Sequence, residues 1–391
     1  MRLRKDTLLI DLQMIVLAGI VVFQALGMAA IAGNLFTLTF FQTAFLWLQR
    51  VKKQIRGKDC LVLLIMGLSC IGVCANAILT DTVVSFSYFK KLIMFWTTLL
   101  YFCAVSEYRT EQRDVRFLFR WNSFVALFLI LMFVIQKDQM HTINGIVTIY
   151  LTFGFTNPNL AAVFLSTMCM IEVIHAAVSR NKESLLHLLL AEVLVVFVFL
   201  TRARNAQLVL ALFLAGAFLS LFLSEEKCIL SGWMAVLLVW FPFLFAVGYL
   251  LLVSMPWVKT VFSFLIGEGK GLDSRVGIWT FALKAFGESP LFGAYTQISG
   301  GTGASQMHNS HLDILASYGG PVLVLTCLFL LALLLGKKRT GRGAFLCQWS
   351  FAALLLSGMG EAMLFSGGMG IYLFGGVFLM LKNVEFEGTA E

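Results

Sequence analysis

The chain has 391 residues, of which 59% are hydrophobic and only 13% are charged. A water-soluble domain of this size could not bury so much apolar surface, so the composition excludes an ordinary soluble protein and indicates a lipid bilayer as solvent. The formal net charge of +8 is better explained by basic cytoplasmic loops than by a nucleic-acid partner, which we do not expect.

The apolar segments predict an all-α polytopic membrane protein with about twelve transmembrane helices, since about 20 apolar residues cross a bilayer. We expect one integral-membrane domain over residues 1–391. The predicted spans are 8–28, 31–49, 60–79, 89–106, 117–135, 157–178, 184–201, 205–223, 228–253, 317–335, 343–358 and 366–382.

The basic residues orient these spans. With the amino terminus inside, twenty of the 29 lysines and arginines fall in segments on that side. Basic residues gather in cytoplasmic loops, so both termini should be cytoplasmic, and residues 254–316 should form a large extracytoplasmic loop. Within that loop, Asp273 or Ser274 can cap a short amphipathic helix that Pro290 ends.

Two kinds of residue inside the spans have structural explanations. The eight cysteines show no CxxC or metal-ligand spacing, so we expect packing residues, no disulfide and no metal site. Glu172 and Glu192 lie within spans, and pairing with a loop arginine is the simplest explanation for both.

Asparagines mark the external mouth of the sixth span. Asn157 precedes Pro158, which is typical of a turn, and Asn159 is a plausible helix cap. Capping is the default interpretation. A sugar-binding role for the two amides is the alternative, and we keep it as a hypothesis.

Three arginines fall at expected external positions. Arg202 and Arg204 lie where one span ends and the next begins, and Arg275 lies on the loop helix. A guanidinium matches phosphate oxygens and keeps its charge. These residues are therefore candidate phosphate ligands, although snorkelling or a simple surface position would also explain them.

Two histidines end the external loop. His308 and His311 stand at the start of an apolar run that looks helical, and they would share a face if the helix begins near Asn309 or earlier. Histidine titrates near neutral pH and can accept a hydroxyl proton. The pair predicts a general base beside the membrane. Asp313 could orient a neighbouring group or face water, and we expect it to face water.

Together these features resemble the O-antigen ligase and polysaccharide polymerase superfamily of bacterial membrane glycosyltransferases. The residues that match the family's arginine turn, its loop motif and its histidine motif are Ala203, Arg204, Asn205, Ala206, Leu208 and Leu210; Arg275, Trp279, Pro290, Leu291, Phe292 and Gly293; and His308, Asn309, Leu312 and Gly319. The Asn-Pro-Asn turn at 157–159 is also similar to this group.

The resemblance implies a membrane glycosyltransferase of C-type architecture and an inverting, metal-independent transfer from a polyprenyl-diphosphate-linked oligosaccharide. Arg204, Arg275 and secondarily Arg202 would bind the diphosphate, and His308 would be the base. Asn157, Asn159 and Asn309 would contact the glycan. The family usually has an aromatic or aliphatic residue where His311 stands, which leaves open which histidine is the base.

The expected activity is polymerisation of lipid-linked repeats into a capsule, exopolysaccharide or O-antigen on the outer face of the bacterial cytoplasmic membrane, with no cofactor. Its partners would be a glycan or lipid acceptor, membrane lipids and other polysaccharide-assembly proteins. A ligase that moves the finished glycan to an acceptor such as lipid A core is the close alternative. A lipid-linked glycan transporter and a non-catalytic assembly scaffold are alternatives from other classes.

Overall fold

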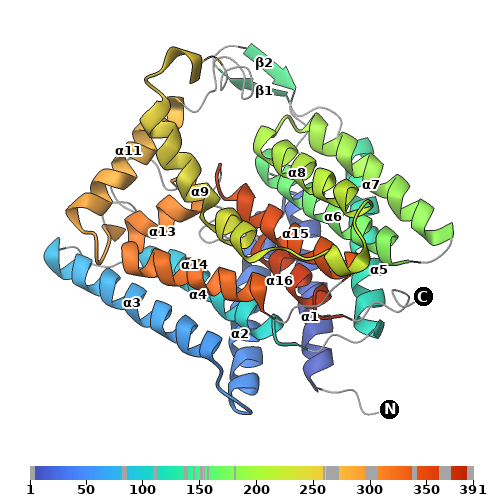
Figure 1. The fold of residues 1–391 in the computed structure, drawn as a ribbon, viewed down its shortest axis with the longest axis horizontal. Helices are drawn as coiled ribbons and strands as arrows, with labels where there is room; N and C mark the ends of the chain where they lie inside the picture. Colours follow the sequence, from blue (N-terminus) through green and yellow to red (C-terminus); the bar gives the residue numbers. More distant parts are fainter. Residues whose placement is uncertain are drawn as a thin grey trace.

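A computed structural model describes residues 5–81, 86–108, 112–135, 140–143, 146–149, 153, 155, 158–179, 182–258, 260, 273–295, 307–336, 341–360 and 371–384. These residues are almost entirely helical (Figure 1). The helices are α1 (Lys5–Ala25), α2 (Ala29–Val51), α3 (Gly57–Leu79), α4 (Phe86–Val105), α5 (Gln112–Ile135), α6 (Pro158–Val178), α7 (Lys182–Leu200), α8 (Arg204–Ser220), α9 (Gly232–Leu252), α11 (Asp273–Glu288), α13 (Ser310–Tyr318), α14 (Gly320–Leu335), α15 (Arg342–Ser357) and α16 (Ile371–Leu381).

The helices confirm the all-α class and the membrane character. Eleven of the predicted spans overlap one helix each, and the span 317–335 overlaps both α13 and α14. The number of spans remains a prediction. Among the described residues, six helices are long and apolar enough to cross a membrane: Ala30–Val51, Gly57–Leu79, Gln112–Ile135, Pro158–Val178, Glu183–Leu200 and Gly232–Leu252. Four shorter apolar helices cover Met14–Ala25, Lys91–Val105, Arg204–Ser220 and Gly320–Leu335.

Two short strands were not predicted. β1 (Met140–Ile143) pairs antiparallel with β2 (Ile146–Ile149), and Met140 lies opposite Ile149. Isoleucine, valine and threonine favour extended backbone because their branched side chains fit a pleated surface. The strands occupy a connection between α5 and α6 to which the hydropathy pattern assigned no element.

The core of the molecule surrounds α6. Its residues from Leu160 to Glu172 are all buried, and α6 packs against α5, α7, α8, α15 and α16. A helix that is apolar on every side is buried by neighbours. The peripheral helices instead expose large apolar side chains, which is expected where lipid is the solvent. Examples are Phe41, Leu64, Leu131, Phe199 and Leu251.

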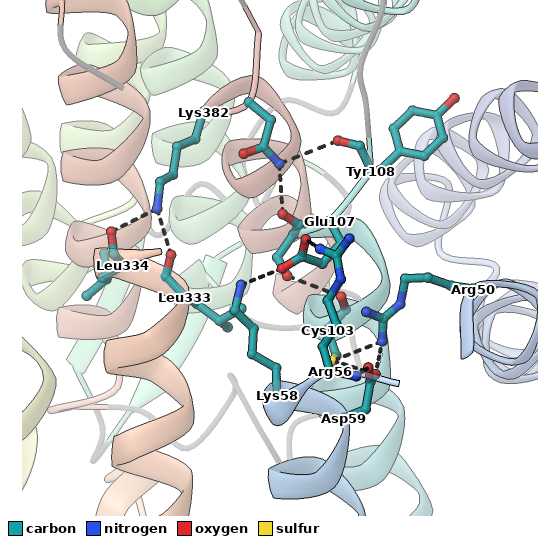
Figure 2. A network of polar contacts seen from close by, with 12 residues as sticks. Arg50, Arg56, Lys58, Asp59, Cys103, Glu107, Tyr108, Leu333, Leu334 and Lys382 are labelled. Carbon is teal, nitrogen blue, oxygen red and sulfur yellow. Dashed lines mark hydrogen bonds and ion pairs between the residues drawn. The ribbon is translucent and has the colours of Figure 1, made fainter. Parts of the chain in front are cut away.

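Polar contacts gather the ends of α2, α3, α4, α14 and α16 at one place (Figure 2). Arg50 pairs with Asp59, and both Arg56 and Lys58 pair with Glu107. Lys382, after α16, donates to the Leu333 and Leu334 carbonyls at 2.7 and 2.8 Å, where an ammonium stabilises a helix carboxyl end. All of these ends were predicted to lie inside.

The 254–316 segment, which was predicted to form a large loop, includes two helices that pack onto the bundle. α11 ends at Glu288, two residues before Pro290, as predicted, but its first helical residue is Asp273, which was predicted to lie at or before the cap. Trp279 and Ala282 of α11 are fully buried, and the helix packs against α9 and α13. α13 also packs against α3, α9 and α14. Figure 1 shows α11, α13, α3 and α14 together on one side of α15.

Candidate substrate-binding and catalytic site

Three segments that the sequence singles out meet at the turn after α15. This 357–360 turn comprises Ser357, Gly358, Met359 and Gly360. All four carbonyls accept hydrogen bonds from other segments of the chain. The donors are the Asn205 amide to Ser357 at 2.8 Å, the Ser310 backbone N–H to Gly358 at 2.8 Å, the Asn309 amide to Met359 at 3.2 Å, and the Arg275 guanidinium to Gly360.

The helix end explains why these donors gather. The last carbonyls of a helix have no partner within it, and α15 ends at Ser357. Side chains from α8 and α11 and the segment that starts α13 satisfy this turn. The arginine turn, the loop helix and the histidine segment are therefore held around one backbone loop, although they are up to about 100 residues apart in sequence.

Arg202 and Arg204 are both exposed at this end of the bundle. α7 ends at Leu200 and α8 begins at Arg204, so the two arginines do not share one continuous helix. Neither has an ion-pair partner among the residues that the structure describes. Two uncompensated guanidiniums beside an apolar bundle are suited to an anionic ligand.

Arg275 is half-buried, and its hydrogen bond to the Gly360 carbonyl holds one edge of the guanidinium against the 357–360 turn. On the same helix, the fully buried Trp279 donates from Nε1 to the Met307 carbonyl at 3.0 Å. Met307 immediately precedes His308. The loop motif therefore positions both Arg275 and the histidine segment.

Asn309 is the N-cap of α13. Its side-chain oxygen accepts from the backbone N–H groups of His311 and Leu312 at 3.1 and 3.0 Å. Its amide donates to the Pro242 carbonyl at 2.8 Å and to Met359. All four hydrogen-bonding positions of the side chain are used, and the residue is fully buried. In this arrangement Asn309 positions the segment that starts α13, and the predicted glycan contact would require its side chain to give up one of these hydrogen bonds.

The two histidines occupy different environments. α13 begins at Ser310, so His308 lies before the helix and does not share a helical face with His311. His308 is half-buried and has a positive φ of 48°. His311 is 2% exposed, and neither ring nitrogen has a hydrogen-bond partner of good geometry among the described residues. His308 is therefore the more accessible of the two histidines.

Burial lowers the pKa of His311 to about 4, and the Val239 carbonyl of α9 offsets part of this effect. α13 is not one of the membrane-crossing helices. The imidazole is therefore neutral at physiological pH, and the surrounding protein encloses it.

Backbone strain coincides with two of the predicted residues. Among the described residues, only Asp81, Phe153, Arg202 and His308 are non-glycine residues with positive φ. This conformation costs roughly 1–2 kcal/mol, and it is found preferentially at functional sites. Two of the four are candidate ligand or base residues, so the strain independently marks the same region.

Asp313 does not face water, contrary to the prediction. It is 3% exposed and pairs with Lys91 of α4 at 2.8 Å. Lys91 also donates to the Ser317 hydroxyl at 3.3 Å. Both lysine contacts fix α13 to α4, so Asp313 is part of the support for the histidine segment.

The loop motif docks directly on the glycine that ends α13. The Ala294 N–H donates to Ala316 at 2.7 Å, and the Gly320 N–H donates to Pro290 at 2.9 Å. A Cβ on Gly293 would lie 2.5 Å from the Ser317 carbonyl carbon, and one on Gly319 would overlap the Leu291 carbonyl. Both glycines have positive φ. A larger residue at either position would therefore separate the loop motif from the end of α13.

The Asn-Pro-Asn turn is described only in part. Asn157 lies outside the described residues. Pro158 is the first residue of α6, a position that suits its fixed φ. Asn159 is consequently the second residue of the helix and not its cap, and it is half-buried. A glycan-binding role for these two asparagines remains a prediction.

Glu172 does not pair with a loop arginine, contrary to the prediction. Its Oε1 accepts from the Asn122 amide at 2.7 Å and the Ser123 hydroxyl at 2.8 Å, and its Oε2 lies 2.6 Å from His187 Nδ1. His175 lies beside His187. Neither histidine was among the predicted site residues, although the Glu-x-x-His spacing of Glu172 and His175 is present in the sequence.

No protein-family model matches this chain, and no curated protein matches it either.

Proposed function

We propose that the protein is a membrane glycosyltransferase that polymerises polyprenyl-diphosphate-linked oligosaccharide repeats into a surface polysaccharide. The observation that carries this proposal is the 357–360 turn, which ties the segments of Arg204, Arg275 and His308 together. Cationic groups and an accessible imidazole beside an apolar bundle suit a substrate with a diphosphate, a lipid tail and a hydroxyl acceptor.

The proposed reaction is a single displacement at the anomeric carbon of the donor sugar. An acceptor hydroxyl oxygen forms the new glycosidic bond while the bond between that carbon and the diphosphate oxygen breaks. The electron pair leaves with polyprenyl diphosphate, and the hydroxyl proton passes to His308, which releases it to water. Arg204, Arg275 and Arg202 stabilise the charge that grows on the diphosphate.

His308 is the proposed base in preference to His311, because His308 is half-buried whereas His311 is enclosed. A general base must come within hydrogen-bond reach of the proton that it accepts. His311 instead fills the space between α13 and α9.

The proposed topology has twelve spans, cytoplasmic termini and an extracytoplasmic site in the bacterial cytoplasmic membrane. Two groups of contacts support it. The Lys58–Glu107 and Lys382–Leu333 contacts join segments predicted to be inside, and the Lys91–Asp313 and Asn76–Gly293 contacts join segments predicted to be outside. The excess of basic residues assigns the first group to the cytoplasm.

A ligase that uses the same donor is the second candidate. The arginine and histidine arrangement suits both reactions, because the donor diphosphate and the acceptor hydroxyl are chemically equivalent in the two. A transporter would instead be expected to hold its polar groups near the midplane between repeated halves. Here the candidate arginines lie at helix ends.

The test uses purified protein in nanodiscs with a polyprenyl-diphosphate oligosaccharide as sole substrate, and the products are sized by mass spectrometry. A ladder of repeats with released polyprenyl diphosphate supports a polymerase. Product only after a separate glycolipid acceptor is added supports a ligase. If folded protein forms no product in either case but moves the labelled donor across a vesicle membrane, the glycosyltransferase proposal is wrong.

A further inference from the structure

A second polar cluster lies away from the 357–360 turn, inside the hairpin of α6 and α7. Glu172 and His175 come from α6, and His187 comes from α7. Each residue offers one ligand atom, and these three atoms all lie within 4.8 Å of one another. Glu172 is fully buried, whereas both histidines are half-buried.

The helix geometry brings these groups together. Residues 172 and 175 are three apart, so their side chains share one face of α6. The α7 helix returns antiparallel and places His187 opposite that face. Its Nδ1 lies 2.6 Å from Glu172 Oε2, and its ring centroid is 3.7 Å from that of His175.

An ion pair between Glu172 and His187 does not account for the whole cluster. His175 Nδ1 is buried and has no hydrogen-bond partner among the described residues. The His175 ring lies against the His187 ring. Burying the Nδ1 atom of His175 without a hydrogen-bond partner costs free energy unless another group binds it. A positive ion among the three side chains would satisfy His175 and Glu172 together.

The outer contacts resemble those that orient metal ligands. The Glu172 oxygen not facing His187 accepts from Asn122 Nδ2 and Ser123 Oγ of α5, at 2.7 and 2.8 Å. Such hydrogen bonds fix a ligating carboxylate and tune its basicity. His175 is stacked on Phe119, with 4.0 Å between ring centroids and 5° between planes, so its ring orientation is also fixed.

We propose that Glu172, His175 and His187 bind one divalent first-row transition ion, with zinc as the reference ion. Two imidazoles and one carboxylate suit this class, whereas magnesium and calcium prefer all-oxygen sites. A tetrahedral zinc site with bonds of about 2.1 Å spaces its ligands about 3.4 Å apart. The present separations reach that value with small side-chain movements. The ion replaces the proton shared by His187 and Glu172.

The ion has a structural role, because it joins α6 to α7 far from the candidate active site. Glu172 is 13 residues from Asn159 along α6, and His187 is 13 residues from Leu200 along α7. Each separation corresponds to about 20 Å of helix. The ion therefore stabilises the hairpin whose two helices run to Asn159 and to the turn of Arg202 and Arg204. This inference is independent of the proposed glycosyl transfer.

The experiment measures metal content and thermal stability of the full chain in nanodiscs, purified by an affinity tag that contains no histidine. After chelator treatment and its removal, zinc is titrated by calorimetry and cobalt by visible absorption. We expect one equivalent of zinc, a rise in Tm of several degrees, and cobalt bands typical of a four-coordinate site.

The variants separate ligands from supports. His175→Ala, His187→Ala and Glu172→Gln should each abolish stoichiometric binding, and Asn122→Ala should weaken it by about 10–100-fold while leaving the three ligands in place. His141→Ala, which removes a histidine of β1, is the matched control and should bind like wild type. No zinc- or cobalt-dependent change in folded wild-type protein, or equal loss in His141→Ala, would overturn the proposal.

Discussion

At the scale of single residues, His308 and His311 differ in accessibility, which the sequence alone did not reveal. His308 lies outside α13 and is accessible, whereas His311 is enclosed between α13 and α9. An imidazole can act as a base only where a substrate reaches it. The difference gives one prediction for transfer and a second for stability.

We expect His308→Ala to lower the transfer rate by about 10²–10⁴-fold, the usual contribution of a general base. His311→Leu should retain at least a tenth of the wild-type rate, because it changes packing and not proton transfer. Initial rates of polyprenyl diphosphate release measure both. Wild-type rate in His308→Ala would remove this residue from the mechanism and favour a non-catalytic scaffold.

His311 should make the folded state sensitive to acid. Its pKa is about 4 in the folded protein and about 6.5 when the chain is unfolded. A depressed histidine pKa contributes stability that is fully present above about pH 6.5 and is lost as the pH falls toward 4. The loss at pH 5, relative to pH 7.5, is about 2 kcal/mol.

Thermal unfolding in detergent at pH 7.5 and pH 5 checks this sign. The Tm of wild type should fall further between the two pH values than the Tm of His311→Leu, which lacks the titrating group. Equal shifts in the two proteins would show that the imidazole is not the group responsible.

At the scale of elements, the 290–293 segment packs on Gly319 and so holds the end of α13, the helix that follows His308. Gly319→Ala should destabilise the fold by about 3 kcal/mol or more, because its Cβ would overlap the Leu291 carbonyl at a positive φ. Gly293→Ala should have a similar effect against Ser317.

Gly277 in α11 offers the matched control. A Cβ there would meet no atom within 4 Å, so Gly277→Ala should raise stability by about 0.5–1 kcal/mol through helix propensity. The Tm values of the three variants in one detergent compare these effects. A Gly319→Ala protein as stable as Gly277→Ala would show that the two segments do not pack as described.

The helices were largely predictable from the sequence, because apolar runs of near-bilayer length leave few alternatives to a helix. α11 was predicted with its stop at Pro290, since proline cannot continue a helix. The pairing partners were not predictable. Asp313 was assigned to solvent and Glu172 to an arginine, because hydropathy does not reveal that α4 carries Lys91 to α13 or that α7 carries His187 to α6.

The site was predictable as a set of segments but not as a geometry. Arg204, Arg275 and His308 were singled out from residue type and position, yet nothing in the chain around Ser357–Gly360 indicated that this turn connects their segments. The turn holds these segments through its backbone carbonyls. Every residue has a backbone carbonyl, so no residue type in the sequence identifies such a turn. The cap role of Asn309 was not predicted, since an asparagine side chain can serve either as a helix cap or as a glycan ligand.

At the scale of the whole molecule, the proposed orientation predicts which surfaces a membrane-impermeant thiol reagent reaches. Both Arg202 and Arg113 are exposed, but they lie on segments assigned to opposite sides. In intact spheroplasts, Arg202→Cys should be labelled and Arg113→Cys should be labelled only after permeabilisation, each relative to the parent chain. The reverse pattern would invert the topology and place the candidate site in the cytoplasm.

In the proposed mechanism the arginines around the 357–360 turn stabilise the departing diphosphate. The most direct test is the rate of polyprenyl diphosphate release by Arg204→Ala, compared in the same nanodiscs with Arg113→Ala, which removes an exposed arginine at a distance from the site. We predict a loss of about 10²–10³-fold for Arg204→Ala and a near wild-type rate for Arg113→Ala. Equal rates in the two variants would contradict the account.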